Sequence, residues 1–212
     1  MMQGSYVALV TPFRDGKVDY GALERLVNFH VEQGTDGVVP CGTTGESPTL
    51  SMKEHEEVVA ATVRFAAGRI HVMAGTGANS TSEAVELTRA AEEAGANSAL
   101  LVSPYYNKPE PEGMYLHFKT VAESVGIPLV LYNIPSRTGR EIALETLVRL
   151  SEIKNITGLK AACGSTDRVT EVVRRTKLEV LSGDDSMTLP FMSVGAKGVI
   201  SVAANIVPTD VR

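Results

Sequence analysis

Short apolar runs alternate along the chain with longer segments in which apolar residues recur at helical spacing. The run at 6–10 ends at Pro12, and Leu23, Leu26 and Val27 then follow the helical period. The pattern repeats and predicts eight strands, at 6–10, 37–40, 71–75, 98–102, 129–132, 156–160, 179–181 and 198–202. It predicts helices between and around them, at 20–33, 52–67, 82–94, 112–125, 143–150, 167–175 and 187–193.

Glycines and serines mark the ends of these helical segments. Two serines stand three residues before a glutamate at a helix start, which predicts capping boxes that pair Ser51 with Glu54 and Ser80 with Glu83. Glycine also falls just past several helical segments, where a left-handed residue ends a helix: Gly34, Gly68, Gly95, Gly126 and Gly195.

Strands that alternate with helices predict a parallel sheet, and eight is the number that closes a (β/α)8 or TIM barrel. We expect a single α/β barrel domain over residues 1–212, with a doubly wound open sheet as the alternative. Only 203–212 follow the eighth strand, and 208–210 are typical of the start of another helix. The eighth helix is thus missing, which predicts an exposed surface beside strand eight and either a C-terminally truncated chain or a partner that covers that face.

The composition is that of a soluble globular protein, with 43% hydrophobic and 21% charged residues among 212. A net charge of −5 and a pI near 5.4, without a basic stripe, argue against nucleic-acid binding. The sequence shows neither a targeting segment nor an apolar run of about 18 residues, so we expect a cytoplasmic protein that does not enter membranes.

The histidines and cysteines do not form a recognisable site. His30, His55, His71 and His117 are scattered singly without metal-ligand spacing, so no metal is expected. Nothing indicates that the two cysteines, Cys41 and Cys163, meet, and no disulfide is inferred.

Lys160 is the last residue of the predicted strand 156–160 and follows the apolar Leu159. From this segment alone, a surface lysine with its ammonium in water is the more ordinary interpretation. The alternative is an amine in a partly desolvated pocket. Burial lowers the pKa there, so a neutral fraction can attack a carbonyl and form a Schiff base.

The residues that follow the other strands favour the second interpretation, because a barrel gathers them at one rim. After strand two, Thr43 and Thr44 lie between glycines with backbone N–H groups that can hold a carboxylate, although an ordinary glycine turn would look the same. Tyr132 ends strand five, and Arg137 after it offers a two-pronged donor for a carboxylate.

Two further strand ends carry residue types that can take part in chemistry. The loop after strand four presents two phenols, Tyr105 and Tyr106, which suit interface packing or proton transfer. The Gly-Thr-Gly turn at 75–77 lacks the third glycine of a dinucleotide loop, so no nucleotide cofactor is expected.

Four segments resemble sequences of the pyruvate-dependent class I aldolase family typified by N-acetylneuraminate lyase: GTTGE at 42–46, PYYNKP at 104–109, YNIPSRTG at 132–139 and GLK at 158–160. The similarity runs from Gly4 to about Asp210, and PSRTG favours the dihydrodipicolinate synthase branch. The resemblance implies a TIM-barrel lyase that needs no cofactor. It would condense pyruvate with L-aspartate 4-semialdehyde to give 4-hydroxy-tetrahydrodipicolinate, in lysine and diaminopimelate biosynthesis.

The resemblance also implies how the catalytic groups work. Lys160 would form the Schiff base with pyruvate. Tyr132 would relay protons through Thr44 and through a second tyrosine, Tyr106, which in the family is donated across a dimer interface.

Substrate binding is implied by the same resemblance. Thr43 and Thr44 would hold the carboxylate of pyruvate, and Arg137 would bind the carboxylate of the aldehyde. Backbone around Gly183 and Ile200 would line the pocket.

The family's feedback site for lysine lies at a subunit interface, so the resemblance implies a homo-oligomer, a dimer or tetramer, with lysine as an inhibitor. Pro48 and Met52 depart from the form best known to be inhibited, and Ala161 stands where a glutamate is usual. The family also continues into an eighth helix and a C-terminal helical domain. The positions that match the feedback site are Ser47, His55, Asn79, Glu83 and Tyr105.

Two other functions stay open beside this one. A sibling pyruvate-dependent aldolase would act on a sugar acid or a hydroxy-oxo acid with the same lysine, and Arg137 discriminates because a sugar-acid pocket needs hydroxyl partners. A non-catalytic truncated paralogue or assembly partner is the alternative from another class.

Overall fold

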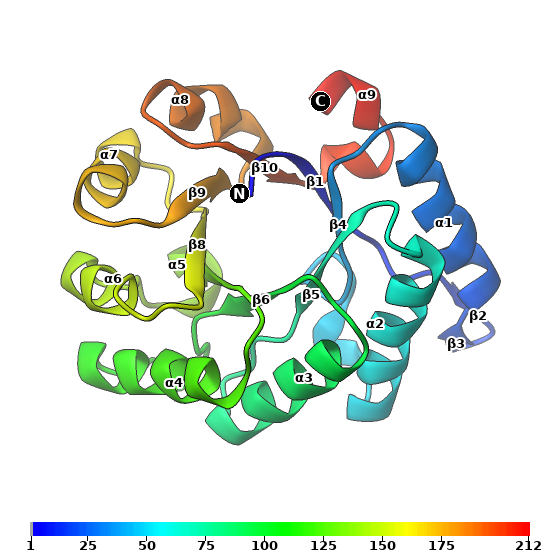
Figure 1. Ribbon diagram of the computed structural model, residues 1–212, viewed down its shortest axis with the longest axis horizontal. Coiled ribbons are helices and arrows are strands. Elements are labelled where there is room, and N and C mark those ends of the chain that lie inside the picture. The colour runs from blue at the N-terminus through cyan, green and yellow to red at the C-terminus, as the bar shows by residue number, and fades with distance from the viewer. Residues whose placement is uncertain (1) are drawn as a thin grey trace.

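The computed structural model describes residues 2–212, in which eight parallel strands close into a barrel in the order β1-β10-β9-β8-β7-β6-β5-β4 (Figure 1). Each strand lies within two residues of its predicted bounds, so the predicted (β/α)8 barrel is confirmed and the open sheet is wrong. The strands are β1 (Gly4–Ala8), β4 (Gly37–Val39), β5 (His71–Gly75), β6 (Ser98–Val102), β7 (Leu129–Asn133), β8 (Ile156–Ala161), β9 (Glu179–Ser182) and β10 (Gly198–Ser201).

Helices form the outer ring around this barrel (Figure 1). The helices predicted from helical spacing lie within one residue of their predicted bounds, and the predicted helix start at 208 is confirmed as α9. The helices are α1 (Tyr20–Glu32), α2 (Met52–Ala66), α3 (Thr81–Glu93), α4 (Pro111–Ser124), α6 (Leu144–Leu150), α7 (Thr166–Arg175), α8 (Thr188–Ser193) and α9 (Pro208–Val211).

Several short elements lie in the connections, where the sequence pattern did not predict them. β2 (Phe13–Arg14) and β3 (Lys17–Val18) form a hairpin whose turn places Asp15 and Gly16 at positive φ. α5 (Pro135–Thr138) is a single turn after β7. Elements this short contain too few residues to show a period. The same holds for the 3-10 turns η1 (Ser47–Thr49), η2 (Asp185–Met187) and η3 (Ala203–Asn205).

Most helix ends follow the local signals. Ser51 and Glu54 form a complete capping box at α2, whereas at α3 only the Ser80 hydroxyl makes its bond. The prediction for Gly126 is wrong. α4 ends in an extended residue, and the Gly126 N–H donates to the Glu92 carboxylate of α3 at 2.8 Å instead of turning left-handed. The other predicted end glycines do have positive φ: Gly34, Gly68, Gly95 and Gly195.

The barrel wall separates an inner layer from an outer core, because successive strand residues point to opposite faces. The outer set packs against the helices, where side chains such as Phe118 of α4 and Leu23 of α1 are fully buried. The inner set fills the barrel and includes Tyr6, Ala8, Val39, Met73, Leu100, Val130, Tyr132, Ile134, Ala162, Leu181 and Ile200. The inner layer is thus a packed floor beneath the carboxyl ends of the strands.

Apolar side chains remain exposed beside the eighth barrel strand, β10. Leu189 of α8 is 78% exposed, and Val202 and Ile206 after β10 are 52% and 80% exposed. In Figure 1, α8 and α9 lie to either side of this strand. The predicted exposure of the surface beside strand eight is confirmed.

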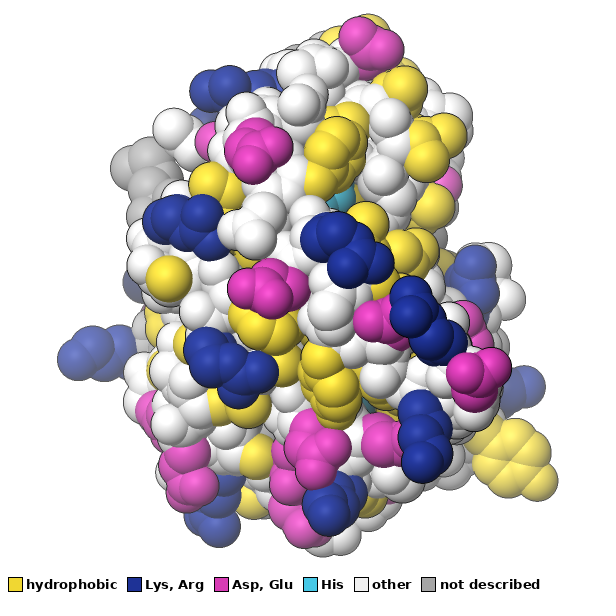
Figure 2. Space-filling model, turned by 90° about the vertical axis from the view of Figure 1, so that its right-hand side faces the viewer, with side chains coloured by type: hydrophobic (Ala, Val, Ile, Leu, Met, Phe, Trp, Pro, Cys, Tyr) yellow, Lys and Arg dark blue, Asp and Glu magenta, His cyan; other side chains and the backbone are white. Residues whose placement is uncertain are grey.

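Charged side chains of both signs lie interspersed over the face that carries α1 and α2 (Figure 2). Within residues 2–212, no helix has the length and apolar character that a membrane crossing requires.

Gly75 at the end of β5 allows the loop after β4 to approach closely, since a Cβ there would lie 2.5 Å from the carbonyl oxygen of Cys41. We expect Gly75→Ala to lower the free energy of unfolding by about 1–3 kcal/mol, because backbone atoms must move to accept the methyl group. Gly113→Ala is the contrasting variant. Its site on α4 is exposed, and alanine there should raise stability by about 0.5–1 kcal/mol. Chemical denaturation of both variants measures this, and equal midpoints would contradict it.

Candidate active site

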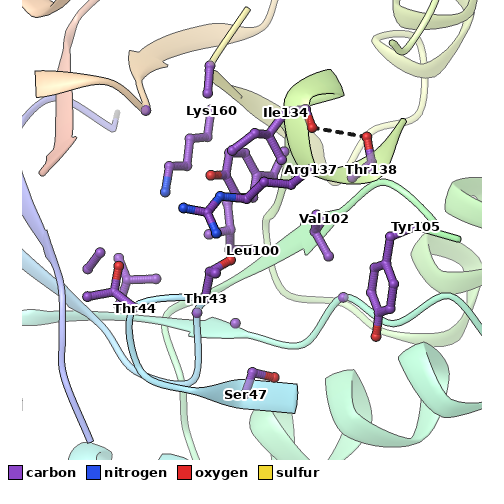
Figure 3. Close-up of a pocket in the computed structure, with 18 of the residues that line it drawn as sticks. Thr43, Thr44, Ser47, Leu100, Val102, Tyr105, Ile134, Arg137, Thr138 and Lys160 are labelled. Atoms are coloured by element: carbon purple, nitrogen blue, oxygen red, sulfur yellow. Dashed lines mark hydrogen bonds between the residues drawn. The ribbon is translucent and has the colours of Figure 1, made fainter. Parts of the chain in front are cut away.

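A cavity of about 580 Å³ opens at the carboxyl ends of the barrel strands (Figure 3). Its walls come from the loops after β4, β5, β6, β7, β8, β9 and β10, which is where a TIM barrel carries its active site. The polar side chains that line it are Thr43, Thr44, Ser47, Tyr105, Tyr132, Ser136, Arg137, Thr138, Lys160 and Asp184.

Lys160 reaches this cavity from the inner face of β8. The side chain is only 6% exposed, and its Nζ lies 4.2 Å from the centre of the Tyr132 ring. Burial above all, together with the Arg137 cation, lowers the pKa of Lys160 to about 8 against the opposing effect of the aspartates at 184 and 185. The amine is therefore desolvated and partly neutral near pH 8, and the interpretation of Lys160 as a surface lysine is wrong.

Tyr132 stands beside Lys160 because the two residues are register partners in the adjacent strands β7 and β8. Burial raises the pKa of Tyr132 to about 12, an effect that the Arg137 cation opposes and the Asp184 carboxylate reinforces. The phenol is thus protonated at neutral pH and can donate a proton next to the amine.

Thr43 and Thr44 belong to a tight loop that begins and ends in left-handed backbone, with φ of 54° at Cys41 and 59° at Glu46. Two hydrogen bonds close this loop on itself, from the Glu46 N–H to the Thr43 carbonyl and from the Ser47 N–H to the Gly42 carbonyl. A compact loop of this kind presents hydroxyl groups in a fixed arrangement that suits a small carboxylate.

Arg137 extends into the same cavity from α5. Lys160 and Thr43 extend into this space from the other sides (Figure 3). The single turn of α5 is held by the Thr138 hydroxyl, which donates to the Ile134 carbonyl at 3.1 Å. Gly139 ends the turn with φ of 74°. The Arg137 guanidinium thus offers a two-pronged donor that suits a substrate with a carboxylate.

The remaining candidate residues take different positions. Gly183 lines the cavity, Ile200 is fully buried in the inner layer, and Tyr106 does not line the cavity and is 89% exposed. Among the effector candidates, Ser47 and Tyr105 line the cavity.

The other three effector candidates lie outside the cavity lining. His55 is buried on α2, and the Asn79 carbonyl accepts a bond from the Asn107 side chain at 3.0 Å. Burial raises the pKa of the Tyr105 phenol, and the nearby Glu83 carboxylate raises it further.

Asp184 is a cavity residue that sequence reasoning missed. It follows Gly183 after β9 and its charge acts on both Lys160 and Tyr132. The Gly-Asp-Asp run at 183–185 after a predicted strand was the available signal, because acidic residues at that rim face the site. Within residues 2–212, no group of three or more His, Cys, Asp or Glu side chains is arranged to hold a metal ion.

A TIM barrel with a desolvated lysine at its mouth, beside a phenol and a hydroxyl-bearing loop that suits a carboxylate, has the features of a class I aldolase type of enzyme. The family model of the dihydrodipicolinate synthetase family matches residues 1–212. The chain belongs to that family.

Known relatives extend this likeness over the whole chain. The 4-hydroxy-tetrahydrodipicolinate synthase of Aquifex aeolicus is 57% identical, with 100% of this chain and 73% of the relative aligned. A crystal structure of dihydrodipicolinate synthase from the same species gives a TM-score of 0.98 over 99% of this chain and 73% of that one.

Two other solved structures of the family carry ligands. The chloride-inhibited dihydrodipicolinate synthase of Acinetobacter baumannii, complexed with pyruvate, is 52% identical with a TM-score of 0.96 over 100% of this chain and 74% of that one. The enzyme of Cyanidioschyzon merolae with lysine bound is 40% identical with a TM-score of 0.96, over 99% and 72%.

The charges around Lys160 give a pair of opposite expectations for its titration. The rate at which an acylating reagent modifies Lys160 should rise with pH, and the midpoint of this rise should lie near pH 8, because only the neutral amine reacts. Arg137→Gln removes a repelling cation, so the ammonium is favoured and the midpoint should move up. Asp184→Asn removes an attracting anion, so the midpoint should move down. Quantitative peptide mapping after brief acylation between pH 6 and 10 measures all three proteins, and shifts of the same sign would contradict this account.

Proposed function

We propose that this chain condenses pyruvate with L-aspartate 4-semialdehyde to give 4-hydroxy-tetrahydrodipicolinate and water. The observation that carries the proposal is the buried Lys160 amine, with its lowered pKa, in one cavity with Thr43, Thr44 and Arg137. The family and the name of the Aquifex aeolicus relative support this choice of substrates.

In the first step, the neutral Nζ of Lys160 adds to the ketone carbon of pyruvate, and loss of water leaves an iminium ion. Tyr132 is a protonated phenol next to the amine, so it supplies the proton that the departing hydroxyl needs. The loop hydroxyls of Thr43 and Thr44 hold the carboxylate of pyruvate and orient its ketone toward the lysine.

In the second step, the iminium withdraws electrons, so the pyruvate methyl gives a proton to the Tyr132 phenolate left by the first step, and the iminium becomes an enamine. The enamine carbon attacks the aldehyde, and the new alkoxide takes a proton from the relay of Tyr132 and Thr44. The substrate amine then attacks the iminium carbon, closes the ring and releases Lys160 unchanged. One water is lost overall, and no oxidant or reductant is required.

Arg137 suits the second substrate because its guanidinium enters the cavity from the α5 turn, on the wall that also carries Tyr132. A bidentate pair with the carboxylate of the aldehyde would hold the reacting carbon near the enamine. An arginine at this place favours an acceptor aldehyde that carries a carboxylate over the neutral, hydroxyl-bearing aldehyde from which a sugar acid is made.

Tyr106 enters the proposal through a second copy of the chain. Its phenol is 89% exposed, and its backbone is held at a φ of 69°. We infer a homo-oligomer, a dimer or tetramer, in which this tyrosine extends the proton relay of a neighbouring subunit.

Replacing the nucleophile tests the chemistry directly. Lys160→Met should abolish turnover and eliminate the adduct that borohydride traps with pyruvate, because Lys160 is the only lysine among the described residues that line the cavity. Intact mass and peptide mapping read the adduct, and circular dichroism checks that the fold survives. Wild-type activity in the folded variant would reject the mechanism. Turnover of aspartate semialdehyde by the wild type, measured against a panel of other aldehydes, tests the substrate assignment.

Lysine inhibition is the regulatory part of the proposal. Ser47 and Tyr105 line the outer part of the cavity, and Glu83 lies close enough to act on the Tyr105 phenol. A phenol, a carboxylate and a backbone carbonyl at Asn79 are partners that suit the ammonium groups of an amino acid. The lysine-bound relative from Cyanidioschyzon merolae supports this choice of effector.

Lysine added to the assay should therefore lower the initial rate in a saturable way. Glu83→Gln should weaken this inhibition severalfold and leave the uninhibited rate near that of the wild type, since it removes one partner of the effector cation. Initial rates across a lysine titration measure both effects. An unchanged rate at millimolar lysine would reject the site.

A further inference from the structure

Thr11 contacts the carboxylate-binding loop from outside. It follows β1, its side chain is 6% exposed, and its Oγ1 donates to the Gly45 carbonyl at 2.6 Å. Among the described residues, this hydroxyl is the donor that satisfies the Gly45 carbonyl. A buried carbonyl without a partner is costly, so the bond ties the loop to the end of β1.

The peptide group between Gly45 and Glu46 is bonded at both ends. Its carbonyl accepts from Thr11, and its N–H donates to the Thr43 carbonyl at 3.1 Å. Since a peptide group is planar, rotation of this one breaks both bonds together. Loss of the Thr11 bond therefore also weakens the bond between this peptide group and the backbone of Thr43.

The loop needs such a restraint because part of its backbone is strained. Glu46 sits at a φ of 59°, a region that costs a non-glycine residue about 1 kcal/mol or more. Gly45 is packed against the segment that follows β1 as well, since a Cβ there would lie 2.8 Å from the Leu9 carbonyl oxygen and 3.2 Å from Thr11 Oγ1. Close packing fixes where the loop lies, and the Thr11 bond fixes how its peptide is turned.

We propose that Thr11 is a positioning residue that sets the affinity of the Thr43 and Thr44 loop for the carboxylate of the keto-acid substrate. It lies outside the cavity lining. Its hydroxyl keeps the peptide at 45–46 turned so that the Thr43 backbone, and with it the two threonine hydroxyls, stay in their binding arrangement. This inference rests on the proposed function, because it takes pyruvate as the substrate held by the loop.

Thr11→Val keeps the shape of the side chain and removes the hydroxyl, whereas Thr11→Ser keeps the hydroxyl. We expect Thr11→Val to raise the KM for pyruvate about tenfold, the effect of one lost hydrogen bond. The KM for aspartate semialdehyde should change less than twofold. The kcat should fall by a smaller factor than the one by which the pyruvate KM rises, because Thr44 also serves the proton relay. Thr11→Ser should restore the pyruvate KM to near the wild-type value.

Thr62→Val is the matched control. Thr62 is fully buried on α2 and its hydroxyl also donates to a backbone carbonyl, that of Val58 at 2.8 Å, away from the loop. Its loss should lower the melting temperature without a selective rise in the pyruvate KM. Equal rises in the pyruvate KM for Thr11→Val and Thr62→Val, or failure of Thr11→Ser to restore it, would overturn the proposal.

Amide hydrogen exchange gives a readout that does not depend on the reaction. Thr11→Val should speed exchange of the Glu46 amide, because its bond to Thr43 weakens when the peptide is released. Thr62→Val should leave this amide protected. Unchanged Glu46 exchange in Thr11→Val overturns the positioning role, whereas a wild type that forms no borohydride adduct with pyruvate overturns the proposed function itself.

Discussion

Desolvation of the Lys160 amine is the constraint on which the rest of the site depends. An ammonium in water is inert toward carbonyls, and burial in the barrel mouth is the main cause that lowers its pKa to about 8. The closed barrel provides that burial, since its packed inner layer keeps water from approaching the amine from below. Register then places Tyr132 against it, because adjacent parallel strands present paired residues on the same face.

The loops around this amine carry its partners, and each loop is restrained by the barrel or by its own bonds. Arg137 stands on a single turn closed by Thr138, and the threonine loop is held by left-handed residues, internal hydrogen bonds and Thr11. Binding a small keto acid requires groups fixed within a fraction of an ångström, which flexible loops would not provide. The cavity therefore lies above a packed inner layer, and hydrogen bonds restrain the loops that surround it.

Much of the fold could be predicted from the chain because its periodic elements are strongly patterned. The strand 98–102 and the helix 52–67 show their periods plainly, and the structure has them within one residue. The predicted end at Gly126 failed because a carboxylate from the neighbouring helix, Glu92, supplies the bond that decides the local conformation. The hairpin β2–β3 and the turn α5 were missed because two to four residues show no period.

The sequence by itself determined the order of the elements and which residue types stand after each strand, since both follow from local periodicity and spacing. It placed Lys160, Tyr132, Thr43, Thr44 and Arg137 at the rim that became the cavity. Only the tertiary structure decided that the lysine is buried, that Asp184 acts on it and that Thr11 reaches Gly45 across 34 residues. Those properties arise from closure of the barrel, which joins β1 to β10 and β4 and brings together residues that no local pattern connects.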